Sequence, residues 1–590
     1  MSNQSRSTLG NAIQLLNQGR LDEARRICEE HLSARPGDVE ALNILGGIHA
    51  RKGDIPQAIR CAKRVCELQP DNAAFLANLG YLYGQAGHFQ QALFTTAKAV
   101  VADPANSGIL KTFSRQVENI EFYTAAPETR VIRDALSIAL ADESLDPAVF
   151  STPWHSLLLL DPAFEELSET ARTGELDPKA LESTLADPFL LHGLRALLPA
   201  DERLERMVTR LRSHFLTNRN EYTAERFLPF LIALAAHCLL NEHVYACSDE
   251  ETAVVEELEN ALAGMDPDAP AAAAAAALVL CYRDRLRPGL SDPLQQMASP
   301  GRTETGSSLF KLHEPFSILV ERHREAIGRL PSKGGTSSND ISENVARQYE
   351  ENPYPRWRHL EMPRLSEAHR AKGRGRDILV AGCGTGYEAL NLAVHYPEAR
   401  VLGIDLSMAS LAYGKQKADA FGIGNVEFMH GDILDLDELT DRFDLVTSRG
   451  VLHHMSDPVA GWRKLVGRLK PDGLMKIALY SETARASVRL CRDWITEAGF
   501  DATPDGIRAF RQAVFALDGD DPRRDVTNWI DFYSMSMCRD LCFHVQEHNV
   551  DLPWIRSTVA GLGLAFLTMH IGNPVFRQEY REMNPGDRPM

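Results

Sequence analysis

An apolar stretch that ends in three closely spaced glycines determines how the C-terminal half of this chain can fold. Residues 377–381 form a β-type run, Gly382, Gly384 and Gly386 follow it, and a helical pattern begins directly afterwards. A strand that turns straight into a helix needs residues without Cβ, so that a ligand can reach the N–H groups at the helix start. Tyr387 occupies the place where a dinucleotide fingerprint has its third glycine. The loop therefore predicts a cofactor site and disfavours a nicotinamide or flavin cofactor.

Four more β-type runs follow the loop and alternate with helical patterns. They cover residues 400–405, 426–430, 443–448 and 474–480. Strands that alternate with helices form parallel sheets, and such sheets bind ligands at the carboxyl ends of their strands. The pattern predicts an α/β Rossmann-like domain with a mostly parallel sheet.

Asp405 ends the second of these runs, 19 residues past Gly386. An acid at this place in a doubly wound sheet accepts hydrogen bonds from ribose hydroxyls. The alternative is that Asp405 caps the helix expected over residues 408–420.

Residues 345–480 resemble the class I S-adenosylmethionine-dependent methyltransferases. Four stations carry the resemblance in the family's order and at its intervals: residues 381–386, Asp405, residues 431–433 and residues 451–455. The resemblance implies S-adenosyl-L-methionine as the cofactor. It implies the following cofactor-binding residues: Gly382, Cys383, Gly384, Gly386, Asp405, Leu406, Asp432, Ile433 and Ser448.

The same resemblance assigns roles to some of these residues. The three glycines would cradle the methionine part, Asp405 would hold the ribose, and Asp432 with Ile433 would meet the adenine. Most members of the family carry an acid two positions before the first glycine, where this chain has Val380. Glu388 is a candidate for the missing contact to the cofactor's ammonium group, although an acid there is equally explained as a first-turn charge.

Two histidines, His453 and His454, follow the fourth run, beside the expected place of the methyl group. Methyl transfer from a sulfonium is an in-line displacement, so a base is needed only where the acceptor must lose a proton. Either imidazole can take a proton near neutral pH, which makes the pair the catalytic candidates. The alternative, which we favour, is that the pair only packs against the cofactor loop.

An aromatic segment lies upstream of the first strand. Tyr349, Tyr354, Arg356 and Trp357 combine stacking faces and a cation on a proline-stiffened backbone, which is typical of a substrate-binding lid. A rigid connector that packs its aromatic rings on the domain is the alternative. The segment also resembles one that precedes the methyltransferase domain in certain bacterial proteins with tetratricopeptide repeats.

Residues 9–104 repeat with a period of 34, and residues 1–108 are therefore predicted to be a tetratricopeptide array of about three units. The repeat is visible in three registers: Gly19, Gly53 and Gly87; Ala24, Ala58 and Ala92; Pro36, Pro70 and Pro104. Such arrays commonly bind a peptide on their concave face, so a protein partner is expected. A purely structural cap or a self-association surface is the alternative.

The remaining segments complete the predicted organisation. Residues 109–330 are predicted to be a helical middle domain, in which the apolar residues 227–240 are too few to cross a bilayer and form a buried helix. Residues 331–344 are a linker. Residues 481–560 form a helical insertion that caps the substrate site, and residues 561–590 hold the last strand or strands, the first of them at residues 564–571, and a tail.

Composition and cysteine spacing make several other classes of protein and site less favoured. A formal net charge of −18 does not favour nucleic acid as a partner, and ten scattered cysteines without a disulfide framework fit the cytoplasm. Cys538, Cys542, His544 and His548 have zinc-like spacing, but on one helix the cysteines and the histidines fall on different faces, so no metal is predicted.

Two functions are compatible with these patterns. The first is an active methyltransferase whose repeats recruit a substrate or a partner. The second is a scaffold that retains a cofactor-sensing domain without turnover. The sequence leaves the methyl acceptor open, whether it is a protein or a small molecule.

Overall fold

The computed structural model describes residues 3–173, 178–219, 224–266, 269–287, 316–331, 340–363, 365–570 and 574–583. They form two compact units that exchange segments along the chain. The helical unit comprises Met1–His313, Thr503–Leu517 and Thr527–Met535, and the α/β unit comprises Glu314–Ala502, Asp518–Val526 and Ser536–Met590. The predicted insertion at residues 481–560 is therefore divided between the two units.

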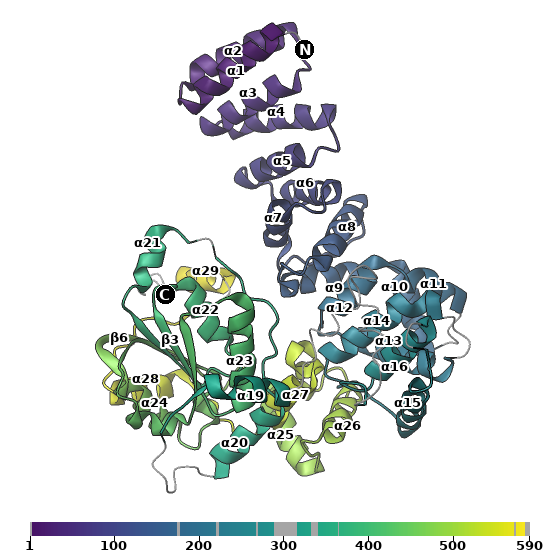
Figure 1. Ribbon diagram of the computed structural model, residues 1–590, viewed down its shortest axis with the longest axis vertical. Helices are drawn as coiled ribbons and strands as arrows, with labels where there is room; N and C mark the ends of the chain where they lie inside the picture. The colour runs from purple at the N-terminus through teal and green to yellow at the C-terminus, as the bar shows by residue number, and fades with distance from the viewer. Residues whose placement is uncertain are drawn as a thin grey trace. The chain divides into compact units, whose positions relative to one another are not determined.

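The N-terminal helices pack in consecutive pairs (Figure 1). They are α1 (Asn3–Asn17) with α2 (Leu21–Ala34), α3 (Val39–Arg51) with α4 (Ile55–Leu68), and α5 (Ala73–Gln85) with α6 (Phe89–Ala102). Gly19, Gly53 and Gly87 lie between the helices of each pair at φ near +78°, a conformation that favours glycine. The 34-residue period of the sequence thus recurs in the helix boundaries.

The middle part of the chain is helical throughout its described residues between 105 and 287. Its elements are α7 (Ser107–Val117), α8 (Pro127–Ala141), η1 (Pro147–Phe150), α9 (Ser151–Leu159), α10 (Pro162–Thr173), α11 (Pro178–Leu185), α12 (Pro188–Ala196), α13 (Glu202–Thr217), α14 (Ala224–Leu240), α15 (Asp249–Leu262) and α16 (Pro270–Leu280). The predicted buried helix at residues 227–240 is confirmed, since nearly all of these side chains are inaccessible to solvent. Among the described helices, none is both long and apolar enough to span a membrane.

A helix from the C-terminal part of the sequence completes this helical unit. In α26 (Pro504–Phe515), the fully buried Arg511 donates through Nη1 (2.8 Å) and Nη2 (2.5 Å) to the carboxylate of Glu205 in α13. Its Nε donates to the carbonyl of Phe532 at 2.7 Å. A charge pair without water needs good geometry and further hydrogen bonds to be tolerated, and this pair has both.

The α/β unit contains a six-stranded sheet in the order β1-β4-β3-β2-β5-β6, with every strand pair parallel. The strands are β1 (Gly328–Arg329), β2 (Asp377–Ala381), β3 (Arg400–Asp405), β4 (Val426–His430), β5 (Phe443–Arg449) and β6 (Leu469–Ala478). The predicted parallel Rossmann-like sheet is confirmed. β6 begins five residues before the predicted run, and the two-residue β1 lies inside the region predicted to be helical.

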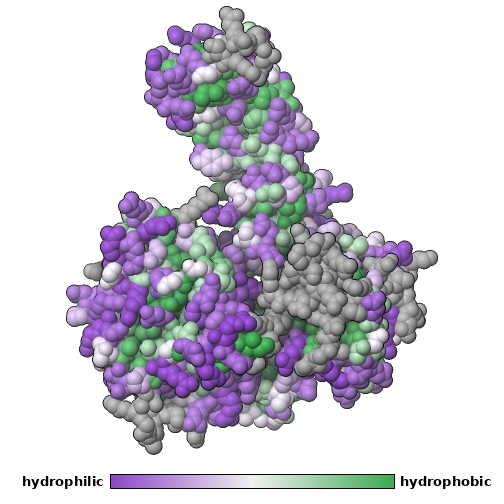
Figure 2. Space-filling model, in the orientation of Figure 1, coloured by the Kyte–Doolittle hydropathy of each residue, from purple (hydrophilic) through white to green (hydrophobic). Residues whose placement is uncertain are grey.

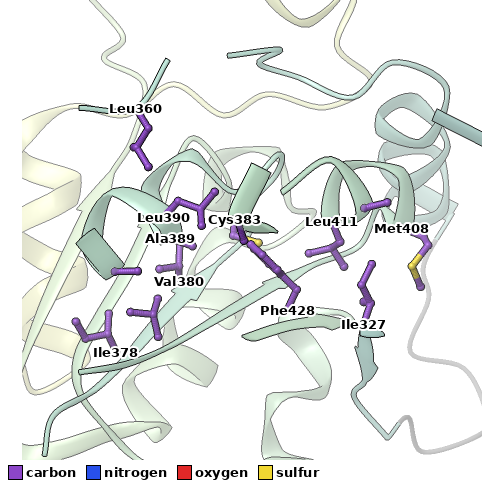
Figure 3. Close-up of a cluster of buried hydrophobic side chains, with 14 of the residues drawn as sticks. Ile327, Leu360, Ile378, Val380, Cys383, Ala389, Leu390, Met408, Leu411 and Phe428 are labelled. Atoms are coloured by element: carbon purple, nitrogen blue, oxygen red, sulfur yellow. The ribbon is translucent and has the colours of Figure 1, made fainter. Parts of the chain in front are cut away.

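Helices cover both faces of the sheet (Figure 1). On one face, α19 (Phe316–His323), α22 (Tyr387–His395) and α23 (Met408–Phe421) contribute to one apolar cluster. On the other face, α24 (Pro458–Gly467) and α28 (Leu552–Gly561) contribute to a second cluster. Figure 3 shows the first cluster, in which Phe428 of β4 reaches up to Cys383 of the glycine loop. In the view of Figure 2, hydrophilic side chains predominate on the surface of this unit.

The strand predicted at residues 564–571 is wrong over residues 564–570, which form neither a strand nor a helix, and Ile571 lies outside the described residues. Hydrophobic β-type residues suggested a strand, but Phe566 and Leu567 are 60% and 73% exposed. Within this segment, Leu564 packs against the core, next to the end of α28. A helix, α29 (Pro574–Met583), follows in the region predicted to be a tail.

The remaining helical elements of the α/β unit surround the ends of the sheet or connect its strands. They are η2 (Arg324–Ala326), α20 (Asp340–Glu351), α21 (Glu367–Arg370), η3 (Ala371–Gly373), η4 (Ile433–Glu438), η5 (Leu452–His454), α25 (Ala486–Ala498), η6 (Pro522–Asn528) and α27 (Met535–Phe543); η7 (Ile530–Tyr533) belongs to the helical unit. Because α20 begins at Asp340, the predicted linker at residues 331–344 is shortened at its end, and its residues 332–339 lie outside the described residues.

Candidate active site

The glycine loop joins β2 to α22 and approaches its neighbours closely. Gly382 has φ +69°, and a Cβ there would lie 2.3 Å from a methyl carbon of Val451. Gly386 has φ +84°, and a Cβ there would lie 3.0 Å from the Cα of Gly414. Glycine is therefore required here by packing as well as by backbone conformation. The loop leaves its backbone open on the side of a cavity.

Asp405 ties this loop to the end of β3. Its partly buried carboxylate accepts hydrogen bonds from Gly384 N (2.7 Å) and Ser407 N (2.9 Å). Burial raises the pKa of Asp405, although these hydrogen bonds favour the ionised form. The cap of α23 is Ser407, whose Oγ accepts from Ser410 N, so the alternative role of Asp405 as the cap of that helix is not its role here.

A cavity of about 460 Å³ opens at the carboxyl ends of the strands, within the size range of ligand pockets. Seven of the nine predicted cofactor-binding residues line it: Gly382, Cys383, Gly384, Asp405, Leu406, Asp432 and Ile433. The other two do not. Gly386 packs against Gly414 and Phe428, and the side chain of Ser448 is buried in β5, while Arg449 and Gly450 line the cavity in its place.

Asp432 lies at the end of β4 and caps the short helix η4. Its carboxylate accepts from Leu434 N at 2.8 Å and is hydrogen-bonded to Ser342 of α20. Burial raises the pKa of Asp432. The carboxylate is thus held at the cavity wall, next to the apolar side chain of Ile433.

Glu388 lines the cavity and lies close to two cations, Arg449 and Lys476. Glu388 accepts a hydrogen bond from Thr447 Oγ1 at 2.9 Å. Arg449 Nη1 and Lys476 Nζ lie 3.2 and 3.6 Å from its carboxylate oxygens. Val380 also lines the cavity and pairs in the sheet with Thr447, so Glu388 lies near the position where the sequence lacks an acid.

The aromatic segment upstream of the sheet is divided between cavity and scaffold. Tyr349 and Tyr354 line the cavity. Trp357 instead donates through Nε1 to the carbonyl of Thr385 at 3.0 Å, and its ring packs against rings of α22 and α23. Arg356 is not among the residues that line the cavity. The segment therefore braces the outer side of the glycine loop and contributes two tyrosines to the site.

The two candidate histidines differ in their surroundings. His453 is 1% exposed, does not line the cavity, and lies with its ring centroid 3.9 Å from that of Tyr480. Burial lowers the pKa of His453 to about 2. His454 does line the cavity, and burial lowers its pKa as well. Its Nδ1 lies 2.8 Å from the carbonyl oxygen of Gln546.

Sequence reasoning did not assign two polar residues beside His454 to the site. Asp540 of α27 lines the cavity and accepts a hydrogen bond from Tyr349 Oη at 2.6 Å. The ring of His544 stacks on that of His454, with centroids 3.6 Å apart. The Cys-x3-Cys-x-His string drew attention to this helix, but Cys538 and Cys542 are buried core residues, and Asp540 between them carried no signal of its own.

Comparisons with known proteins identify the chemistry of this unit. The family model described as "Methyltransferase domain" matches residues 373–509, which include the glycine loop, Asp405, Asp432 and both histidines. The C-terminal part of this chain contains an S-adenosylmethionine-dependent methyltransferase domain. The methyltransferase domain uses S-adenosylmethionine as its cofactor, and the open backbone of the loop, the partly buried Asp405 and the size of the cavity fit that molecule.

Curated relatives share this domain. The chain is 34% identical to the malonyl-[acyl-carrier protein] O-methyltransferase of Acetivibrio thermocellus, with 19% of this chain and 43% of the relative covered. It is 38% identical to the trans-aconitate 2-methyltransferase of Deinococcus radiodurans, with 19% and 41% covered. The chain thus spans less than half the length of these relatives.

Among solved structures, PKMT2 from Rickettsia typhi in complex with AdoHcy aligns at 21% identity and a TM-score of 0.30, over 41% of this chain and 48% of that one.

Proposed function

We propose that the whole chain is an active S-adenosylmethionine-dependent methyltransferase, with methyl transfer in the cavity of the α/β unit. The bound cofactor supplies a methyl group on a sulfonium centre. The observation that carries the proposal is that one cavity joins the glycine loop and Asp405 to a separate polar wall with His454 and Asp540. A domain that only sensed the cofactor would have no need of that second wall.

Each group of residues has a part in this proposal. The loop backbone and Glu388 hold the amino-acid end of the cofactor, with the Glu388 carboxylate toward the ammonium group and Arg449 toward the carboxylate. Asp405 binds the ribose hydroxyls, and Asp432 with Ile433 binds the adenine. The second wall positions the acceptor and excludes water, which are the main demands of an in-line displacement.

The N-terminal helices are proposed to be a tetratricopeptide array that recruits a protein partner or substrate. Three helix pairs at a 34-residue spacing support it, as do small residues at the contacts within pairs. The exposed side chains of Tyr81 and Phe89, 57% and 75% accessible, are available to a partner. Free thiols on all ten cysteines fit a reducing compartment such as the cytoplasm.

The alternative is a scaffold that binds the cofactor without turnover. The presence of Val380, where most members of the family have an acid, favours this alternative.

Titration calorimetry with S-adenosylmethionine decides whether the cofactor binds, and we expect binding to be lost in Asp405→Ala. Asp441→Ala, an exposed acid ahead of β5, is the matched control and should bind normally. Release of S-adenosylhomocysteine in the presence of fractionated cell extract then separates an enzyme from a scaffold, because a scaffold releases none.

A further inference from the structure

Tyr349, His454 and Asp540 form a polar wall of the cavity, and His544, which does not line the cavity, stacks on His454. Tyr349 comes from α20, His454 from η5, Asp540 from α27, and His544 from the residue after α27. Potential ligand or proton-binding atoms of His454, Asp540 and His544 all lie within 4.8 Å of one another, and all three residues are buried.

The backbone of a single residue, Gln546, sets the proton positions on both stacked imidazoles. A carbonyl oxygen can only accept, so the 2.8 Å contact to Gln546 O places a proton on Nδ1 of His454. The backbone N–H of Gln546 can only donate, so its 3.2 Å contact makes Nδ1 of His544 an acceptor. In their neutral forms, His454 therefore has its lone pair on Nε2, and His544 has its proton on Nε2.

The hydrogen of His544 Nε2 has an acceptor in the same wall. Nε2 lies 3.3 Å from Tyr349 Oη, and that hydroxyl donates its own proton to Asp540 Oδ1 at 2.6 Å. The chain of donors thus runs from His544 through Tyr349 to the Asp540 carboxylate. His454 Nε2 remains as the nitrogen with an available lone pair.

We propose that His454 Nε2 is the general base of the methyltransferase, that Gln546, His544, Tyr349 and Asp540 position it, and that the acceptor is a hydroxyl group. This assignment rests on the function proposed above. The acceptor oxygen forms its bond to the methyl carbon as the carbon–sulfur bond breaks and that electron pair stays on sulfur. The hydroxyl proton passes to His454 Nε2, and Asp540 stabilises the resulting imidazolium.

The presence of such a base distinguishes between acceptor classes. A carboxylate is already ionised near neutral pH and needs no base. An alkylamine is mostly protonated near neutral pH, but it loses that proton in a prior equilibrium and the free amine then attacks through its own lone pair. A hydroxyl is a weak nucleophile until a base removes its proton, so it benefits from a neutral imidazole in contact with it.

The ring geometry favours this role over metal binding. The rings of His454 and His544 are nearly parallel, with an interplanar angle of 20°, so their in-plane lone pairs do not converge on one point. The tautomer of His544 also places a proton on the nitrogen that faces the cluster. A metal ligand needs that nitrogen free, with the proton on the other ring nitrogen.

Burial of His454 favours its neutral form, which can accept a proton. Burial is the main cause of its lowered pKa, with Arg485 acting in the same direction and Asp540 and Glu547 acting against it. The titratable and charged groups of the elements packed around it are Tyr349, His453, Tyr480, Arg485, Arg492, Asp540, His544, Glu547 and His548.

Nitrogen-proton correlation spectra of histidine-labelled full-length protein test the tautomer without requiring an acceptor. Signals present in the wild type and absent in His454→Gln are assigned to His454. With S-adenosylhomocysteine bound, these signals should report a proton on Nδ1 and none on Nε2. A proton on Nε2 in these signals would overturn the assignment.

Turnover tests the catalytic role with labelled S-adenosylmethionine and fractionated extract as the probe. A general base is worth roughly 10²–10⁴-fold, so His454→Gln should lose at least about 100-fold in kcat. Its affinity for S-adenosylmethionine should stay within about threefold of the wild type, because His454 lies in the polar wall and is not one of the proposed cofactor-binding residues. His369→Gln, remote on α21, is the control and should be fully active.

The product tests the acceptor class. The methyl label should resist alkali, as an ether does, whereas release as methanol identifies an ester and N-methyl amines identify an amine, and either overturns the hydroxyl assignment. Normal turnover in His454→Gln overturns the base while the proposed function stands. If the wild-type protein binds the cofactor but shows no turnover, both the proposed function and the assignment of His454 as the base are wrong.

Discussion

At the residue scale, backbone conformation and burial determine which side chains reach the cavity. The place of Gly382 and Asp405 at the cavity could be predicted from a strand-to-helix turn and an acid at the end of the next strand, and that of Asp432 from the family resemblance. Asp540 could not, because a single acid on an amphipathic helix has the same pattern whether it faces solvent or a cavity. The difference between His453 and His454 was also hidden, since adjacent residues share a motif but point in different directions.

The requirement for glycine at position 382 is testable against a matched glycine. Gly382→Ala combines a left-handed backbone with a Cβ 2.3 Å from Val451, and we expect it to cost about 2–4 kcal/mol and to abolish cofactor binding. Gly375 has the same φ of +69° but open space around it, so Gly375→Ala should cost only about 1–2 kcal/mol and bind normally. Urea denaturation and calorimetry measure both effects. Equal losses in the two variants would contradict the packing argument.

The raised pKa of the partly buried Asp405 carboxylate predicts a pH dependence of stability without cofactor. Because burial raises the pKa of Asp405 in the folded protein, the folded state holds the proton more tightly than the unfolded state does. Its stabilising contribution is present below the unfolded pKa of about 3.9 and is lost as the pH rises through the folded pKa. Asp405→Asn should therefore gain stability relative to the wild type as the pH rises from about 4 to 7. Urea midpoints at each pH, with Asp441→Asn as the control, would show no such trend if Asp405 were stabilising when ionised.

At the element scale, the sequence predicted β2 to β5 with close bounds, predicted β6 with a late start and missed β1. β2 to β5 are short runs rich in β-type apolar residues, and their predicted bounds agree closely with the structure. β1 has two residues and β6 starts with Leu469, Lys470 and Pro471, so neither start has an apolar signal. Residues 564–570 are rich in β-type apolar residues but form no strand. Composition does not reveal whether a sheet edge is available for such a segment to pair with.

Two aromatic substitutions distinguish the observed C-terminal structure from the predicted strand. Trp554 of α28 packs against the apolar cluster around Trp462, so Trp554→Ala should cost about 2–4 kcal/mol. Phe566 is 60% exposed, so Phe566→Ala should stay within about 0.5 kcal/mol. A large loss of stability in Phe566→Ala, measured by urea denaturation, would restore the strand.

At the scale of the whole molecule, sequence order and structural units do not coincide. The predicted boundary near residue 331 separates two consecutive regions, yet residues 503–517 and 527–535 return to the helical unit. Periodicity identifies helices but not their partners, and the partner of Arg511 lies 306 residues away in sequence. A single buried ion pair therefore carries information about the fold that no local pattern contains.

That ion pair makes the helical unit depend on the C-terminal part of the chain. Arg511→Met leaves the buried Glu205 carboxylate without its partner, and we expect a loss of about 3–5 kcal/mol. Replacing both residues, as Glu205→Leu with Arg511→Met, should recover most of it, because two apolar side chains replace two desolvated charges. Arg172→Met is the control, since its pair with Glu169 is more than half exposed and its loss should stay within about 1 kcal/mol. Thermal unfolding and limited proteolysis of the full chain measure these changes. A double variant as unstable as Arg511→Met alone would mean that packing of α26, and not charge, holds the two distant segments together.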